Sequence, residues 1–118
     1  MKKILFILFF IIIMIFIYNK FLSINSSKLT NLFLNNDSKF NLGKEIFLNK
    51  GKCANCHTLS NAGSYADIGP DLNKVMPKKI RVIKTVTEGI GSMPAMADIL
   101  SKDEIEAVAE YVYQASKK

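Results

Sequence analysis

The sequence has few of the side chains from which catalytic and metal sites are built. It holds one histidine and two cysteines in 118 residues. A structural zinc site needs four ligands, and no second cysteine pair or second histidine is present to complete one. No Ser-His-Asp set, carboxylate pair or phosphate-binding loop is recognisable in the sequence. The sequence therefore predicts a protein that is not itself an enzyme.

Strand-like alternation, internal repeats and a strong charge bias are also absent from the sequence. The net charge of the whole chain is +6, but four of the basic residues lie before Lys39. From Lys39 onward, twelve basic and nine acidic residues leave a net charge of only +3. This charge is too mild to indicate nucleic-acid binding, which calls for a concentrated basic surface.

The N-terminus has the pattern of an export segment. Lys2 and Lys3 precede residues 4–18, which contain no charge, and a basic start before an apolar run is typical of a signal peptide or membrane anchor. A core helix would show a polar stripe, whereas this run is apolar all round. Extended to Leu22, the helix would span about 28 Å, close to the thickness of a bilayer core. Residues 1–22 are thus predicted to be a signal peptide or transmembrane helix. A retained anchor is favoured because no Ala-x-Ala cleavage site follows.

The remainder divides into a predicted linker, residues 23–38, and a predicted all-α domain, residues 39–118. Helical spacing predicts one helix that stops at Gly51, a second between Pro77 and Gly89, and a third after the capping box that Ser101 and Glu104 form. Long loops join these three main helices. The residues expected on the buried faces are Leu42, Ile46 and Phe47, then Ile80, Ile83 and Val86, then Ile105, Val108, Ala109 and Val112. A core this small is marginal alone, and a large flat apolar group at its centre would complete it.

The one histidine follows the second cysteine directly, so that Cys53, Cys56 and His57 match the haem-attachment motif Cys-x-x-Cys-His. Two thiols one turn apart can add to the two vinyl groups on one porphyrin edge, and the next residue brings an imidazole beneath the iron. A simple disulfide would leave the histidine unexplained, and a thioredoxin-like redox pair would need a βαβ context. The motif predicts one covalently bound haem c.

With this motif in place, the chain from Lys39 to Ser116 resembles the class I c-type cytochromes. The resemblance rests on three segments in order: CANCH at 53–57, IGPDL at 68–72 and GSMPA at 91–95. Within the family, the chain is similar to the small cytochrome subunits that accept electrons in periplasmic sulfite dehydrogenases.

The resemblance implies a role for three individual residues. His57 would be the proximal iron ligand, and the carbonyl of Pro70 would accept a hydrogen bond from its second ring nitrogen. Met93 would supply a thioether on the opposite face and raise the reduction potential. Pro70 is open to the alternative of an ordinary loop proline, and Met76 and Met96 compete with Met93. The resemblance also implies that Gly43 and Phe47 meet Tyr111 at a helix crossing.

A one-electron carrier with His/Met ligation, on the periplasmic side of the bacterial cytoplasmic membrane, is the function that these observations predict. The alternatives are an electron-accepting cytochrome subunit of a dehydrogenase, such as sulfite dehydrogenase, and a haem peroxidase or gas-binding protein if no methionine ligates. Redox proteins, an acidic one among them, are the expected partners, and no nucleic acid is expected. A basic run around the second helix is either a docking patch for an acidic partner or an ordinary solvated face. It consists of Lys74, Lys78, Lys79, Arg81 and Lys84.

Overall fold

The structure is a computed structural model that describes residues 2–118, with the side chains of residues 2, 23–27 and 29–34 left out of the description. The chain divides into two compact units, and the boundary lies between Asn36 and Asp37. The predicted bounds of the linker and the domain, 23–38 and 39–118, stay predictions.

The N-terminal unit is helical throughout its described backbone and belongs to α1 (Lys2–Glu45). Within it, Lys3–Leu22 is long and apolar enough to cross a membrane, with a mean hydropathy of 2.6 and no part of the segment buried. The helix continues through residues 23–38, where the Asn- and Ser-rich composition had not indicated regular structure. A linker in this chain would thus be a helical one.

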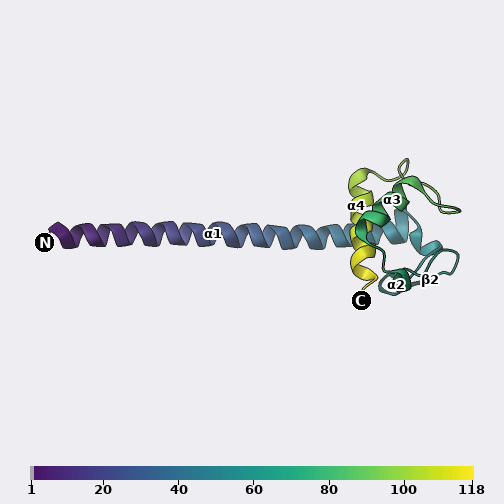
Figure 1. The fold of residues 1–118 in the computed structure, drawn as a ribbon, viewed down its shortest axis with the longest axis horizontal. Helices are drawn as coiled ribbons and strands as arrows, with labels where there is room; N and C mark the ends of the chain where they lie inside the picture. The colour runs from purple at the N-terminus through teal and green to yellow at the C-terminus, as the bar shows by residue number, and fades with distance from the viewer. Residues whose placement is uncertain (1) are drawn as a thin grey trace. The chain divides into compact units, whose positions relative to one another are not determined.

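The C-terminal unit is mostly helical, as predicted, with one two-stranded sheet (Figure 1). The end of α1 leads into a π-helical turn, η1, and α3 packs on α4. Strands β1 and β2 pair antiparallel, with Thr58 opposite Tyr65. After α1, the elements in order are η1 (Ile46–Lys50), η2 (Cys53–Asn55), β1 (Thr58–Leu59), η3 (Ser60–Ala62), β2 (Ser64–Tyr65), α2 (Leu72–Val75), α3 (Lys79–Glu88) and α4 (Lys102–Ala115).

Helix α4 begins at the capping box that the sequence predicted. The Ser101 hydroxyl accepts from the Glu104 amide at 3.3 Å, and the Glu104 carboxylate accepts from the Ser101 amide at 2.8 Å. Two amides that helix geometry leaves without partners are thereby satisfied. Helix α3 ends at Gly89, whose φ of 72° lies in the region that favours glycine. The predicted ends of both helices are therefore confirmed to within about two residues.

The core is centred on the crossing of α1 and α4, as the resemblance implied. A Cβ atom on Gly43 would collide with the Ala107 carbonyl and lie 2.7 Å from Tyr111 Cβ, so only glycine allows this approach. The Tyr111 ring is fully buried and meets Phe40 and Phe47 edge-on, at centroid distances of 5.0 and 5.7 Å. This contact joins the end of α1 to the last helix of the C-terminal unit.

The buried faces of two helices differ from those expected. Ile80, predicted to be core, is 71% exposed, and Leu42 is also largely exposed. The inward face of α3 carries Val82 and Val86 instead, with Ile83 partly buried against the same core. In each of the two helices, the exposed residue is the first one of the predicted apolar stripe, and burial begins further along the helix.

Candidate haem site

Cys53 begins the short turn η2 and Cys56 directly follows it, and the turn is closed by backbone hydrogen bonds to one carbonyl. The amides of Cys56 and His57 donate to the oxygen of Cys53, at 3.1 and 3.0 Å. The turn is preceded by Lys52 with φ 51°, a left-handed conformation that a non-glycine residue adopts at a cost of about 1 kcal/mol. This strained residue redirects the chain between η1 and η2. The two thiols and the imidazole follow it within five residues.

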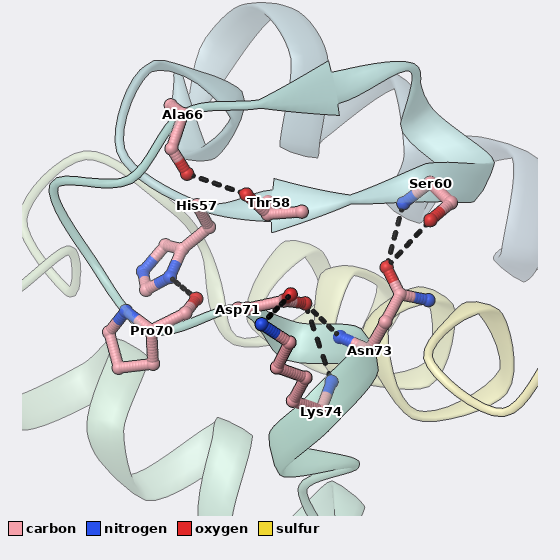
Figure 2. A network of polar contacts seen from close by, with 8 residues as sticks. All are labelled: His57, Thr58, Ser60, Ala66, Pro70, Asp71, Asn73 and Lys74. Carbon is pink, nitrogen blue, oxygen red and sulfur yellow. Dashed lines mark hydrogen bonds and ion pairs between the residues drawn. The ribbon is translucent and has the colours of Figure 1, made fainter.

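His57 is held by the loop that precedes α2. Its Nδ1 lies 2.9 Å from the Pro70 carbonyl oxygen (Figure 2), and the Gly69 amide donates to the Cys56 oxygen at 2.7 Å. A Cβ atom at Gly69 would lie 2.6 to 3.2 Å from three atoms of the imidazole ring. The ring is therefore fixed by a hydrogen bond at one nitrogen and by close backbone contact along its side, which leaves Nε2 as the nitrogen available to a metal.

A set of polar contacts fastens this loop to the cysteine segment (Figure 2). The Thr58 hydroxyl donates to the Ala66 carbonyl at 2.7 Å, and the Asn73 side-chain oxygen accepts from both the amide and the hydroxyl of Ser60. Asp71 caps α2 by accepting from the amides of Asn73 and Lys74. The position of the Pro70 carbonyl is thus set on both sides, by the hairpin and by the start of α2.

An apolar cavity of about 490 Å³ lies between these segments, α3 and the loop that follows it. Natural cores have few voids larger than a water molecule, and cavities of a few hundred cubic ångströms are typical of ligand sites. All five predicted cofactor residues line this cavity: Cys53, Cys56, His57, Pro70 and Met93. The structure therefore brings together in one place residues that lie up to forty positions apart in the sequence.

The three competing methionines have different environments. Met93 lines the cavity and is half-buried, whereas Met96 is 9% exposed within the hydrophobic core and Met76 is 56% exposed. Ile90 and Met93 exchange backbone hydrogen bonds of 3.0 and 2.9 Å, and Gly91 between them has φ 56°. This tight turn holds Met93 against the cavity wall, so the geometry favours it over both alternatives.

The other interpretations of the cysteine pair have less support. Neither cysteine forms a disulfide, and burial raises the pKa of the Cys53 thiol to about 11, which is the opposite of the lowered pKa of a reactive redox thiol. Among the described side chains, no group of three or more His, Cys, Asp or Glu residues could hold a metal ion. The site fits a haem instead, because it pairs a large apolar cavity with two thiols at its edge and an oriented imidazole.

Sequence reasoning missed several residues that shape the cavity. Gly69 appeared in a quoted motif, but its contact with the His57 ring was not foreseen. Arg81 was assigned to a surface patch, yet it lines the cavity together with Thr85. The sequence spacing could have indicated this. Arg81 and Thr85 lie four positions apart and therefore share one face of α3, next to the cavity-lining Val82 and Val86.

This fold and this site define a monohaem c-type cytochrome, and comparison with known proteins agrees. Residues 39–112 match the family described as cytochrome c oxidase, cbb3-type, subunit III. Cytochrome c6 of Cladophora glomerata is 42% identical over 79 residues, which are 60% of this chain and 82% of that protein. Cytochrome c6 of Microcystis aeruginosa is 38% identical over 81 residues, 64% of this chain and 96% of that protein.

A solved structure is similar as well. The crystal structure of the c-type cytochrome SorU from Sinorhizobium meliloti aligns with a TM-score of 0.66 and 46% identity, over 70% of this chain and 95% of that one. Because the family match covers more than half of the chain, the chain belongs to the cbb3-type subunit III family of c-type cytochromes. It is an electron-transfer protein rather than an enzyme, and its cofactor is a covalently bound haem c.

Proposed function

We propose that this chain is an exported one-electron carrier in which Cys53 and Cys56 bind the haem and His57 and Met93 ligate its iron. The observation that carries the proposal is the convergence of these four side chains on one apolar cavity, with Nδ1 of His57 2.9 Å from the Pro70 oxygen. When bound, the haem supplies reversible one-electron chemistry between ferrous and ferric iron.

The residues of the chain prepare the site for this chemistry. The Pro70 carbonyl accepts a hydrogen bond from the Nδ1–H group of His57, which fixes the tautomer and makes Nε2 the better electron donor to a metal. Met93 offers a soft sulfur that favours ferrous iron and so raises the reduction potential. The apolar lining excludes water, and a low-dielectric site disfavours the extra positive charge of the ferric state. A high reduction potential and a small change of ligand geometry on reduction are the expected result.

The site is tested by expressing the protein with a competent haem-ligation system. We expect covalent haem staining in a denaturing gel and a far-red methionine-to-iron charge-transfer band in the ferric spectrum. The double variant Cys53→Ala/Cys56→Ala should lose the covalent stain, and each single variant should keep one thioether or lose the haem. A wild-type protein without covalent haem would overturn the site.

Export and anchoring form the second part of the proposal. Lys3–Leu22 is long and apolar enough to cross a membrane, and the lysines at its N-terminal end, Lys2 and Lys3, favour a cytoplasmic N-terminus. The cytochrome unit would then lie on the periplasmic side, together with its expected redox partners. Alkaline extraction of membranes tests the anchor: a retained helix keeps the haem stain in the pellet, whereas a cleaved signal releases it and shortens the mature chain.

A dehydrogenase subunit, for example of sulfite dehydrogenase, is the second candidate, and exposed apolar side chains at the cavity support it. Ile68 and Ile90 both line the cavity, although they are 75% and 65% exposed, and Val75 beside them is 53% exposed. Exposed apolar groups that cluster at a site indicate contact with another protein. The two candidates differ in the lifetime of that contact. Size-exclusion chromatography of the native membrane extract separates a free carrier from a subunit that elutes with a partner.

A further inference from the structure

Among the described side chains, Arg81 is the one arginine or lysine that lines the apolar cavity. It lies in the first turn of α3, with its backbone amide bonded to the Lys78 carbonyl at 2.9 Å. Within the described part of the chain, the Arg81 side chain forms no hydrogen bond or ion pair with another residue, whereas the nearby Lys79 pairs with Glu110 at 2.6 Å. Arg81 is exposed, so its guanidinium reaches solvent as well as the cavity and is available to a group of opposite charge bound there.

Thr85 adds a second polar group to the same wall. It lies one helical turn after Arg81 and so occupies the same face of α3, and it also lines the cavity. Its neighbour Thr87 uses its hydroxyl to bond the Ile83 carbonyl at 2.7 Å, but among the described residues the Thr85 hydroxyl has no such bond. A cation and a free hydroxyl thus line an otherwise apolar stripe that Val82 and Val86 complete.

The cofactor of this family carries the complementary groups. A haem has two propionate carboxylates, on the half of the ring that lies away from the vinyl groups that cysteines bind. The cysteines and Arg81 reach the cavity on different elements: η2 contacts η1 and β2, whereas α3 packs on α4. An arginine presents parallel N–H groups that match a carboxylate in a two-point contact, which a lysine cannot reproduce.

We propose that Arg81, assisted by the Thr85 hydroxyl, binds a haem propionate and is a positioning residue for the cofactor. This inference rests on the haem occupying the cavity as proposed above. It also separates Arg81 from the basic run on α3: the guanidinium acts on the cofactor, and its charge raises the reduction potential because it disfavours the more positive ferric state.

The test compares reduction potentials of four holoproteins: wild type, Arg81→Gln, Arg81→Lys and Lys84→Gln. Lys84→Gln is the matched control, since it removes the same charge from an exposed position of the same helix that does not line the cavity. Each potential is measured at low salt and at 1 M salt, where the screening length is about 3 Å. A charge in direct contact with a carboxylate is screened far less than a solvated surface charge.

We expect Arg81→Gln to lower the potential at both salt concentrations and Arg81→Lys to recover part of the loss. Lys84→Gln should cause a small shift that disappears at 1 M salt. A crystal structure of the holoprotein should place the guanidinium within hydrogen-bond distance of a haem carboxylate. Equal shifts for Arg81→Gln and Lys84→Gln, or a guanidinium directed into solvent, would overturn the assignment.

The experiment distinguishes the role of Arg81 from the proposal that a covalently bound haem occupies the cavity. Haem staining and the ferrous absorption bands report the cofactor independently of the potential. Intact haem with an unshifted potential in Arg81→Gln refutes the role of Arg81 alone. A wild-type protein that carries no covalent haem refutes the haem site and, with it, this assignment.

Discussion

Gly69 lies directly against the imidazole of His57, so closely that a Cβ atom at this position would be 2.6 Å from Cε1 and 2.8 Å from Nδ1. The Gly69 amide also donates to the Cys56 carbonyl at 2.7 Å, so the backbone has little freedom to withdraw. The methyl group of an alanine would therefore displace the ring and not the loop. Movement of the ring stretches the contact between Nδ1 and the Pro70 oxygen, which is 2.9 Å long.

We therefore predict that Gly69→Ala lowers both the yield of covalent haem and the reduction potential. An overpacked contact of this kind costs about 1–3 kcal/mol of stability. Gly63→Ala is the matched control, because Gly63 has open space around it but a φ of 66°. Its cost, of the order of 1 kcal/mol, is conformational and should leave the spectrum unchanged. Thermal unfolding measures the stability of both variants, and redox titration measures their reduction potentials. Indistinguishable titrations would contradict a role of the contact between Gly69 and the His57 ring in setting the potential.

The environments of the methionines predict a different outcome for each one. Met93→Ala should keep the haem attached, lower the potential and let the ferrous form bind carbon monoxide. Met76→Ala should alter neither property, since Met76 is 56% exposed and does not line the cavity. Met96→Ala should keep the spectrum of the wild type but lose about 2–5 kcal/mol of stability, because it empties a buried core position. A normal charge-transfer band in Met93→Ala would transfer the ligand role to another residue.

Features whose residues lie close together in the chain could be predicted from the sequence. In the haem site, Cys53, Cys56 and His57 form one motif. In the fold, the capping box of α4 needs only Ser101 and Glu104. Such local patterns carry their own geometry. The crossing of Gly43 with Tyr111 was foreseen through the family resemblance, since neither residue indicates its partner by itself.

The rest depends on how separate elements meet. Nothing near Ile80 in the sequence shows that burial on α3 begins only at Val82, so the exposed isoleucine was misassigned to the core. The strands β1 and β2 have two residues each, too short for any alternation to be visible. Arg81 was grouped with the surface lysines because Lys78, Lys79 and Lys84 lie within three positions of it. It is indeed exposed, but the structure shows that it also lines the cavity, which the sequence did not indicate.

Acid should destabilise the contact between α4 and the start of the cytochrome unit. Lys50 and Lys39 donate to Glu104 and Glu106 at 2.6 and 2.8 Å, and these hydrogen bonds hold the pKa of each carboxyl below its usual range. A carboxyl with a lowered pKa in the folded state binds fewer protons than it does in the unfolded chain. Stability from these pairs is therefore complete above the usual pKa, near 4.3, and is lost as pH falls through the folded value.

The measurement is the thermal midpoint of the holoprotein from pH 7 down to pH 3. Glu104→Gln is the informative variant, because glutamine can still complete the capping box with Ser101 but cannot pair with Lys50 as a charge. We expect its midpoint to fall less steeply with acid than that of the wild type. Parallel curves for the two proteins would show that this pair makes no contribution to acid sensitivity. Asp103→Asn, which removes an exposed charge of the same helix, serves as the control.

Ion pairs involve part of the basic run and most of the carboxylates of α4. Lys79 pairs with Glu110, and Lys74 lies 3.6 Å from Asp71. Glu104 and Glu106 are also paired, with Lys50 and Lys39, and Arg81 lines the cavity. Within the described structure, the basic run therefore has only two exposed lysines without an ion pair. These are Lys78 and Lys84.

Electron transfer to an acidic redox partner should therefore depend on salt only moderately, because two charges steer the encounter instead of five. Opposite charges raise the association rate more than the affinity, and salt screens them over about 8 Å at physiological ionic strength. Lys78→Gln/Lys84→Gln should flatten the salt dependence of the rate, whereas Lys102→Gln, an exposed lysine on α4, should not. Stopped-flow rates across a salt series measure both effects. A wild-type rate that is already independent of salt would show that Lys78 and Lys84 belong to an ordinary solvated face. Docking would then depend on Ile68 and Ile90, the exposed apolar side chains at the cavity.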